Sequence, residues 1–402
     1  MHKKNSTSAM SPGLVVLTLA LLMGLQPVTT DLYLPALPGL THELGANMVQ
    51  AQLTLTALLL AFGISQLVWG PVSDRFGRRP VLLLGMGAYV LASLASAFSP
   101  TMDLLIVWRT LQGAAMGAAV MCARAIVRDL YAPPQGANVM SKGLSGLGVI
   151  ACLSAPVGGL LTAVFNWHAA LLALSVFGAL TLGLVAFRFQ ETVPQRNPQA
   201  LQPATLARNW LLILRNPTFL AFSSLTICSY SALFTFLASS SFVFIRILGF
   251  STTQYGLVML GNSFTYLLGT FLCRRLLLRL GVRRSVAIAG GLSLTGGTAM
   301  GLLALAGVHA AWAILVPLSL LMLAHGIHNP CGQSGSVGPF PKTAGAASAL
   351  NGFLSMLAAF GTGQWLGTHM DGTANPLVYG MWFWSALLAL TAWTMVARYG
   401  RP

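Results

Sequence analysis

The chain has 402 residues, of which 55% are hydrophobic and only 7% are charged. A soluble domain has about 25% charged residues, so this composition excludes a soluble globular enzyme. The net charge of +15 comes from 22 Lys and Arg against 7 Asp and Glu, an excess typical either of nucleic-acid binding or of the cytoplasmic loops of a membrane protein.

Hydropathy predicts twelve membrane-spanning helices in two groups of six. The first six cover residues 13–34, 53–72, 80–98, 104–122, 139–164 and 169–187. The second six cover residues 219–245, 255–272, 286–306, 312–327, 344–366 and 377–396. We therefore expect an all-α integral membrane protein with an N-terminal six-helix bundle (1–189), a cytoplasmic central loop (190–215) and a C-terminal six-helix bundle (216–402).

The positions of the basic residues predict the orientation of the chain in the membrane. If the amino terminus is cytoplasmic, twenty of the 22 Lys and Arg fall on the inner side of the predicted spans. The exceptions are Arg246, in an outer loop, and Arg109, inside the fourth span. This asymmetry predicts that both termini are cytoplasmic, and it explains the net charge without nucleic acid.

Two short connections resemble each other and indicate an internal repeat. Residues 75–79 read Arg-Phe-Gly-Arg-Arg, and residues 279–284 read Arg-Leu-Gly-Val-Arg-Arg. The central residues, Gly77 and Gly281, are separated by about half of the chain. Many secondary transporters consist of two such six-helix repeats, with the binding cavity between them near the membrane midplane.

One acid and one base lie inside the predicted spans. Asp31 is toward the outer end of the first span, where burial favours the protonated form of a carboxyl group, as a reversible proton carrier needs. An interfacial aspartate that caps the helix end is the alternative. Arg109 keeps its charge and needs an acid, carbonyl groups or substrate as a partner. It can serve in coupling, as a structural clamp between helices, or as both.

Several segments resemble the major facilitator superfamily. Residues 70–80 (GPVSDRFGRRP) resemble its signature loop between the second and third helices, and residues 109–113 (RTLQG) resemble the fourth-helix signature of its proton-coupled members. Residues 30–38 and 124–131 are similar to the bicyclomycin-resistance (Bcr/CflA) branch of drug:proton antiporters. The resemblance implies that Asp31 and Arg109 take part in proton coupling and the response to substrate.

The fifth span departs from the antiporter signature of that family. The signature has Gly-Pro followed by paired glycines, whereas this chain has Ala155, Pro156, Val157, Gly158 and Gly159 with a shortened spacing. Small residues beside a proline still permit close helix packing and a local bend. We treat Pro156, Gly158 and Gly159 as an antiporter-like motif.

The signature loop is also expected to act as a cytoplasmic gate. Asp74 can cap the amino terminus of a facing helix, for which we propose the eleventh span near Ala344. Arginines of the loop can meet carbonyl groups or acids when the inner mouth closes. The predicted gate residues are Gly70, Asp74, Arg75, Gly77, Arg78, Arg79, Arg128 and Asp129.

Weaker signals concern the substrate cavity and a pair of histidines. We predict a cavity lined by Tyr33, Gln112, Tyr230, Phe234 and Tyr266, although aromatic residues in membrane helices commonly only pack. His325 and His328 stand at the predicted end of span ten. They could titrate or bind a metal, but no Cys or acid accompanies them, so we expect a helix-terminal polar cluster and no metal site.

The sequence therefore predicts a multi-pass transporter of the bacterial inner membrane. We expect proton-coupled efflux of small, largely apolar drug-like compounds, such as chloramphenicol- or bicyclomycin-like molecules, by alternating access. The alternative is export of a polar metabolite: a sugar, nucleoside or amino acid. Its partners would be a small-molecule substrate, protons and the lipid bilayer, with no nucleic acid and no cofactor. We expect a monomer and no enzymatic activity, because no catalytic motif is present.

Overall fold

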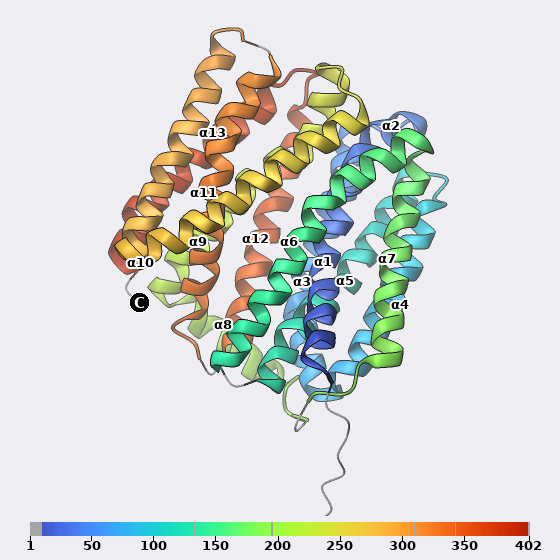
Figure 1. Cartoon of the computed structure of the whole chain (residues 1–402), viewed down its shortest axis with the longest axis vertical. Coiled ribbons are helices and arrows are strands. Elements are labelled where there is room, and N and C mark those ends of the chain that lie inside the picture. The colour runs from blue at the N-terminus through green and yellow to red at the C-terminus, as the bar shows by residue number, and fades with distance from the viewer. Residues whose placement is uncertain (1–9, 132, 194–195, 309, 342, 401–402) are drawn as a thin grey trace, which may run out of the picture.

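The computed structural model describes residues 10–131, 133–193, 196–308, 310–341 and 343–400. The predicted domain limits at residues 1 and 402, and the basic residues Lys3, Lys4, Lys342 and Arg401, lie outside these ranges. Within them the chain forms helices and connections, as the prediction of an all-α protein required (Figure 1).

The first half of the chain contains the helices that precede the central connection. They are α1 (Pro12–Asp31), η1 (Leu34–Ala36), α2 (Leu37–Glu43), α3 (Met48–Phe76), α4 (Arg78–Ala97), α5 (Met102–Leu130), α6 (Pro133–Val164) and α7 (Trp167–Arg188). The second half follows α8 (Pro203–Leu214). It contains α9 (Pro217–Ser241), η2 (Phe242–Ile247), α10 (Thr252–Leu305), α11 (Ala311–Val337), α12 (Ala344–His369), α13 (Asn375–Thr391), η3 (Ala392–Val396) and α14 (Ala397–Tyr399).

Eleven helices of the described chain are long and apolar enough to cross a membrane. One of them, α10, contains two of the predicted spans, 255–272 and 286–306, joined at Gly281. The predicted set of twelve spans is therefore confirmed. Several helices begin with a side chain that accepts from a free backbone N–H group, as in the capping boxes that Asn47 and Ser251 form with Gln50 and Gln254.

The two halves lie side by side and meet along two helix pairs (Figure 1). Helix α3 packs against α12, and α6 packs against α10. Small residues permit close approach, since a Cβ atom on Gly363 of α12 would overlap the methyl group of Thr56 on α3. We call the end of the bundle that carries Arg78, Arg128 and α8 the basic end, and the end that carries α2 and η2 the opposite end.

The internal repeat is visible in the backbone of the two glycines. Gly77 separates α3 from α4 with φ 108° and ψ 159°, and Gly281 divides α10 with φ 73° and ψ 175°. Both positive φ angles favour glycine, because a Cβ atom makes this region unfavourable for other residues. The same turn therefore joins the second and third spans of each half.

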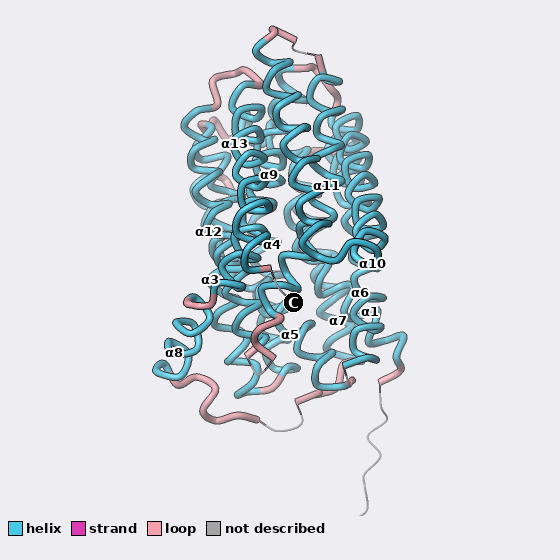
Figure 2. The backbone as a smooth tube through the Cα atoms, turned by 90° about the vertical axis from the view of Figure 1, so that its left-hand side faces the viewer, coloured by secondary structure: helices cyan, strands magenta, loops and turns pink. Residues whose placement is uncertain are grey.

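Two details of the helices differ from expectation. The predicted central loop contains α8, a short helix that buries Ile213 against α9 and α12 at the basic end, where Figure 2 shows it on the edge of the bundle. Helix α11 also continues through Pro330 to Val337. His325 and His328 therefore lie inside this helix, and their predicted place at a helix terminus is wrong.

Candidate functional site

Arg109 is fully buried inside the first half, where its guanidinium contacts three different groups. One terminal nitrogen donates to the Gln112 side-chain oxygen at 2.7 Å, and the other donates to the Thr29 carbonyl oxygen of α1 at 3.0 Å. The guanidinium carbon lies 4.4 Å from the centroid of the Tyr33 ring. Hydrogen bonds and a cation–π contact thus replace the water that a buried charge loses.

A second layer of hydrogen bonds fixes these partners of Arg109. The Gln112 amide donates to Ser93 of α4 at 2.6 Å, and the Tyr33 hydroxyl donates to Thr54 of α3 at 3.0 Å. The network therefore links α1, α3, α4 and α5. The Nε atom of Arg109 has no partner in the described part of the chain. Its two terminal nitrogens nevertheless tie α5 to α1 and, through Gln112, to α4, which favours a clamp between helices as at least one role of Arg109.

Asp31 is the last residue of α1 and is directed toward the second half. Its carboxylate accepts from the Thr30 hydroxyl at 2.8 Å, and the side chain is partly accessible. The short helix η1, which begins three residues after Asp31, contacts α9 and α10 of the second half. The Tyr230 hydroxyl is buried and has no hydrogen-bond partner within the described part of the chain. Asp31 thus lies where the two halves meet.

Asp31 and Arg109 are neighbours through the backbone and do not form an ion pair. Within the described ranges, Arg109 has no carboxylate partner within salt-bridge distance. Instead, it holds the carbonyl group of Thr29, two residues before Asp31. Arg109 therefore positions the helix end that carries the acid.

The antiporter-like motif of α6 supports the same helix end and also contacts the second half. A Cβ atom on Gly158 would overlap the carbonyl group of Leu32, the residue that follows Asp31. The Gly159 carbonyl oxygen accepts from the Thr252 hydroxyl of α10 at 3.2 Å. Despite the altered spacing, the small residues permit α1, α6 and α10 to approach closely beside Asp31.

The predicted gate residues form an ion-pair network centred on Arg78 at the basic end. The Arg78 guanidinium lies 2.7 Å from Asp74 and 2.9 Å from Asp129, and it donates to Ser73 at 2.6 Å. Arg128 is 3.7 Å from Asp74. Arg78 is only 3% exposed, so the two carboxylates compensate a buried positive charge.

The other gate residues have smaller structural roles. Arg79 donates to the Ala186 carbonyl oxygen at 2.9 Å, whereas Arg75 is exposed and lies over the Phe76 ring. A Cβ atom on Gly70 would make ordinary contact with Met121.

Glu191, which sequence reasoning did not select, completes this network. Its carboxylate accepts from the backbone N–H groups of Arg78 and Arg79 at 2.9 and 3.1 Å, and thus caps the amino terminus of α4. Burial alone would raise the pKa of Glu191, but the N–H groups of Val193, Arg78, Arg79 and Thr192 hold the pKa below its usual range. Because the cap is separated from α4 by more than a hundred residues of chain, no local sequence pattern reveals it.

The predicted cap of the eleventh span by Asp74 is not formed in this structure. Asp74 and the amino terminus of α12, beginning at Ala344, line one cavity of about 500 Å³ at the basic end. The Asp74 carboxylate is occupied by Arg78 and Arg128. The two halves are joined here by Arg124, which donates to Ser348 of α12 at 2.6 Å.

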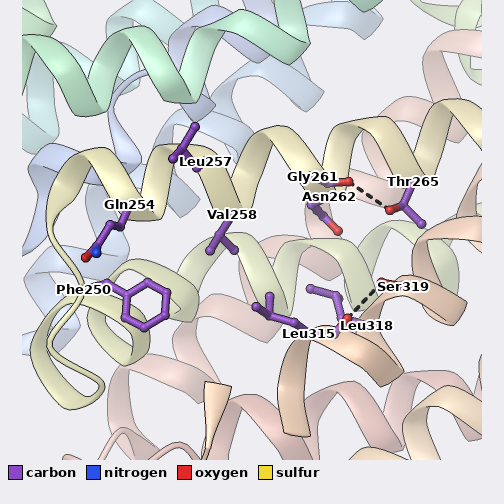
Figure 3. Close-up of a pocket in the computed structure, with 10 residues that line it drawn as sticks. All are labelled: Phe250, Gln254, Leu257, Val258, Gly261, Asn262, Thr265, Leu315, Leu318 and Ser319. Atoms are coloured by element: carbon purple, nitrogen blue, oxygen red, sulfur yellow. Dashed lines mark hydrogen bonds between the residues drawn. The ribbon is translucent and has the colours of Figure 1, made fainter. Parts of the chain in front are cut away.

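The residues predicted to line the substrate cavity lie in different surroundings. Tyr33 and Gln112 belong to the Arg109 network, and Phe234 is buried in the core. Tyr230 lies near Asp31, whereas the Tyr266 ring is 5.3 Å from the His325 ring. A different cavity of about 500 Å³ lies between α10 and α11, wholly in the second half (Figure 3).

The two histidines are both buried in α11 but differ in their hydrogen bonds, since neither ring nitrogen of His328 has a partner in the described part of the chain. The His325 Nδ1 atom is 2.7 Å from the Ser229 hydroxyl oxygen of α9, and His328 is fully buried. Among the residues that the structure describes, no group of three or more His, Cys, Asp or Glu could hold a metal ion.

Two six-helix halves that enclose an acid and an arginine define a multi-pass membrane transporter. Residues 19–363 match the Major Facilitator Superfamily, and the chain belongs to this family. It is 29% identical over 367 residues to a bicyclomycin resistance protein homolog of Haemophilus influenzae, with 91% of this chain and 92% of that protein covered. It is also 29% identical to multidrug resistance protein D of Escherichia coli, with 86% of each covered.

Solved structures show the same fold at lower identity. A D-xylose–proton symporter has a TM-score of 0.72 and 17% identity, with 95% of this chain and 97% of that chain covered. The xylose transporter XylE from E. coli, in a partially occluded inward open conformation, has a TM-score of 0.74 and 13% identity, with 97% and 100% covered. These similarities establish the arrangement of the twelve spans.

Proposed function

We propose that the protein exports small, largely apolar drug-like compounds in exchange for protons. The position of Asp31 carries this proposal, because this carboxyl group ends α1 inside a predicted span and is followed by η1, which contacts α9 and α10 of the other half. Relatives named for bicyclomycin and multidrug resistance support the substrate class. The basic end is the cytoplasmic end in this proposal, and the membrane is the bacterial inner membrane.

In the proposed cycle, Asp31 is deprotonated when substrate enters from the cytoplasm or the inner leaflet. Protonation from the outside then changes the charge at the junction between α1, α9 and α10, and it weakens the hold on the substrate. Arg109 keeps α1 in place through the Thr29 carbonyl group while the charge of Asp31 changes. Rocking of the halves breaks the Arg124–Ser348 contact at the basic end.

Inverted membrane vesicles with an imposed proton gradient test this function. Addition of a transported drug should release part of the gradient, and Asp31→Asn should abolish this release while the protein remains folded and inserted. Asp371→Asn is the matched control, because Asp371 is exposed in a loop at the opposite end and bonds only to Thr373 in the described structure. Normal coupling in the Asp31 variant would refute the assignment.

Export of a polar metabolite is a second candidate, which buried hydroxyl groups of α9 favour. Ser231, Ser241 and Tyr230 each have a buried oxygen without a partner in the described part of the protein. Such groups could bind a substrate rich in hydroxyl or amine groups. A drug-susceptibility panel in a pump-deficient host distinguishes the candidates, since only drug export raises resistance.

A further inference from the structure

A strongly basic surface lies at the turn that joins the two membrane-spanning segments of α10. Five exposed arginines surround Gly281 in this turn, and we call them the α10 arginine cluster: Arg274, Arg275, Arg279, Arg283 and Arg284. Their number alone is consistent with the bias of basic residues toward one side of a membrane. What distinguishes this cluster is that five arginines, none of them paired with an acidic side chain of the described chain, stand together at a single turn.

No acidic side chain of the protein pairs with the cluster. All seven Asp and Glu of the chain are among the described residues, and none forms a salt bridge with these arginines. The second half has a single acid, Asp371, which lies in the loop between α12 and α13 at the opposite end. Because Asp371 is at the opposite end, movement within this half does not bring its side chain to the cluster.

At the equivalent turn in the first half, acidic side chains of the protein itself neutralise the arginines. Next to Gly77, the side chain of Arg78 lies between Asp74 and Asp129. The Glu191 carboxylate accepts hydrogen bonds from the backbone N–H groups of Arg78 and Arg79. The Gly281 turn repeats the backbone geometry and the arginines but not the acids. In this structure no acidic side chain of the protein supplies the counter-charge of this turn, which leaves its surroundings to do so.

The surroundings of the cluster indicate where that charge comes from. Leu278 is 89% exposed and Phe271 is 60% exposed, as expected for side chains that face lipid tails. The Arg274 guanidinium carbon lies 5.7 Å from the centroid of the Phe271 ring. Arginines next to such apolar side chains extend their charged groups to the level of the lipid headgroups.

We propose that the α10 arginine cluster binds the phosphate diester headgroups of anionic phospholipids at the membrane surface. The cluster recognises the lipid by charge, while Leu278 and Phe271 contact its acyl chains. This site is independent of the transported substrate and of Asp31. It gives a role to the Gly281 turn, the copy of the repeated turn that lacks the gate acids.

Titration of the purified full-length protein with phosphatidylglycerol in neutral detergent tests this proposal, with bound lipid counted by native mass spectrometry. Each arginine near an anionic surface strengthens binding roughly fivefold, so the triple variant Arg279→Gln, Arg283→Gln, Arg284→Gln should weaken it ~100-fold. The charge-matched control replaces Arg196, Arg208 and Arg215 of the central connection with Gln. Replacement of the three cluster residues by Lys should retain most of the binding.

The outcome is decided by comparison of the two triple Gln variants. A loss in the cluster variant that exceeds the loss in the control by about fivefold or more supports the proposal, provided that both variants melt like the parent protein in neutral detergent. A smaller difference overturns it. Equal binding of phosphatidylcholine, or equal occupancy by inorganic phosphate at the same concentration, also overturns it.

Discussion

Arg109 and Asp31 show how two charges can be placed in an apolar protein in opposite ways. Arg109 is enclosed on all sides, and its partners are a carbonyl, an amide and an aromatic ring of the same half. Asp31 remains partly accessible and is followed by η1, which contacts α9 and α10 of the other half. Arg109 thus lies within one half of the molecule, whereas Asp31 lies beside the junction between the halves.

The enclosed position of Arg109 predicts that lysine cannot replace it. The Lys side chain has a single ammonium group, which cannot reach both Thr29 and Gln112 in the geometry of the guanidinium fork. Arg109→Lys should therefore destabilise the protein by about 2 kcal/mol, the value of one lost hydrogen bond to a buried charge. Thermal melting of the purified protein measures this, with the exposed Arg398→Lys as control. Equal melting temperatures would show that one hydrogen bond suffices.

At the scale of elements, the two glycine turns are alike in backbone but differ in surroundings. A Cβ atom on Gly77 would overlap the Glu191 carboxylate, whereas nothing lies within 4 Å of a Cβ atom on Gly281. The first turn therefore requires glycine for two reasons, the positive φ angle and the cap of α4. The second requires it for the φ angle alone.

This difference predicts unequal costs for the same substitution. Gly281→Ala should cost about 1 to 3 kcal/mol, the strain of an L-residue in this extended region of positive φ. Gly77→Ala should cost more, because it also displaces the Glu191 cap of α4. In a double-mutant cycle, Glu191→Ala should remove that excess, since a lost cap cannot be lost again. Melting temperatures of the four proteins of the cycle and of Gly281→Ala provide the measurement, and equal costs at the two glycines would contradict the role of Glu191.

At the scale of the molecule, the architecture can be predicted from the sequence because each span is long, apolar and bounded by polar residues. Asp31 and Arg109 could be selected because a charge in an apolar span is conspicuous. Glu191 could not, since its effect depends on a contact between distant segments. Likewise, the composition near Pro330 indicates a helix end, but the surrounding helices allow α11 to continue.

The two ends of the molecule are held together by different contacts, and alternating access requires these contacts to exchange. At the opposite end, the Arg246 guanidinium donates to the Pro38 carbonyl oxygen, and Thr252 donates to Gly159. Each contact joins one half to the other, so its loss favours the conformation in which this end is open. Hydrogen bonds to charged groups contribute about 1.5 kcal/mol or more, which corresponds to roughly a tenfold change in the populations.

Arg246→Gln should therefore expose residues that the closed opposite end covers. Ser240 is a suitable reporter, because it is fully buried near that end and bonds to Tyr255. In a background without the five native cysteines, Ser240→Cys should react up to about tenfold faster with a membrane-impermeant maleimide when Arg246 is Gln. Arg246→Lys retains a cationic donor and should react at close to the parent rate. An unchanged rate in the Gln variant would mean that the remaining contacts, Thr252 with Gly159 among them, keep the opposite end closed without Arg246.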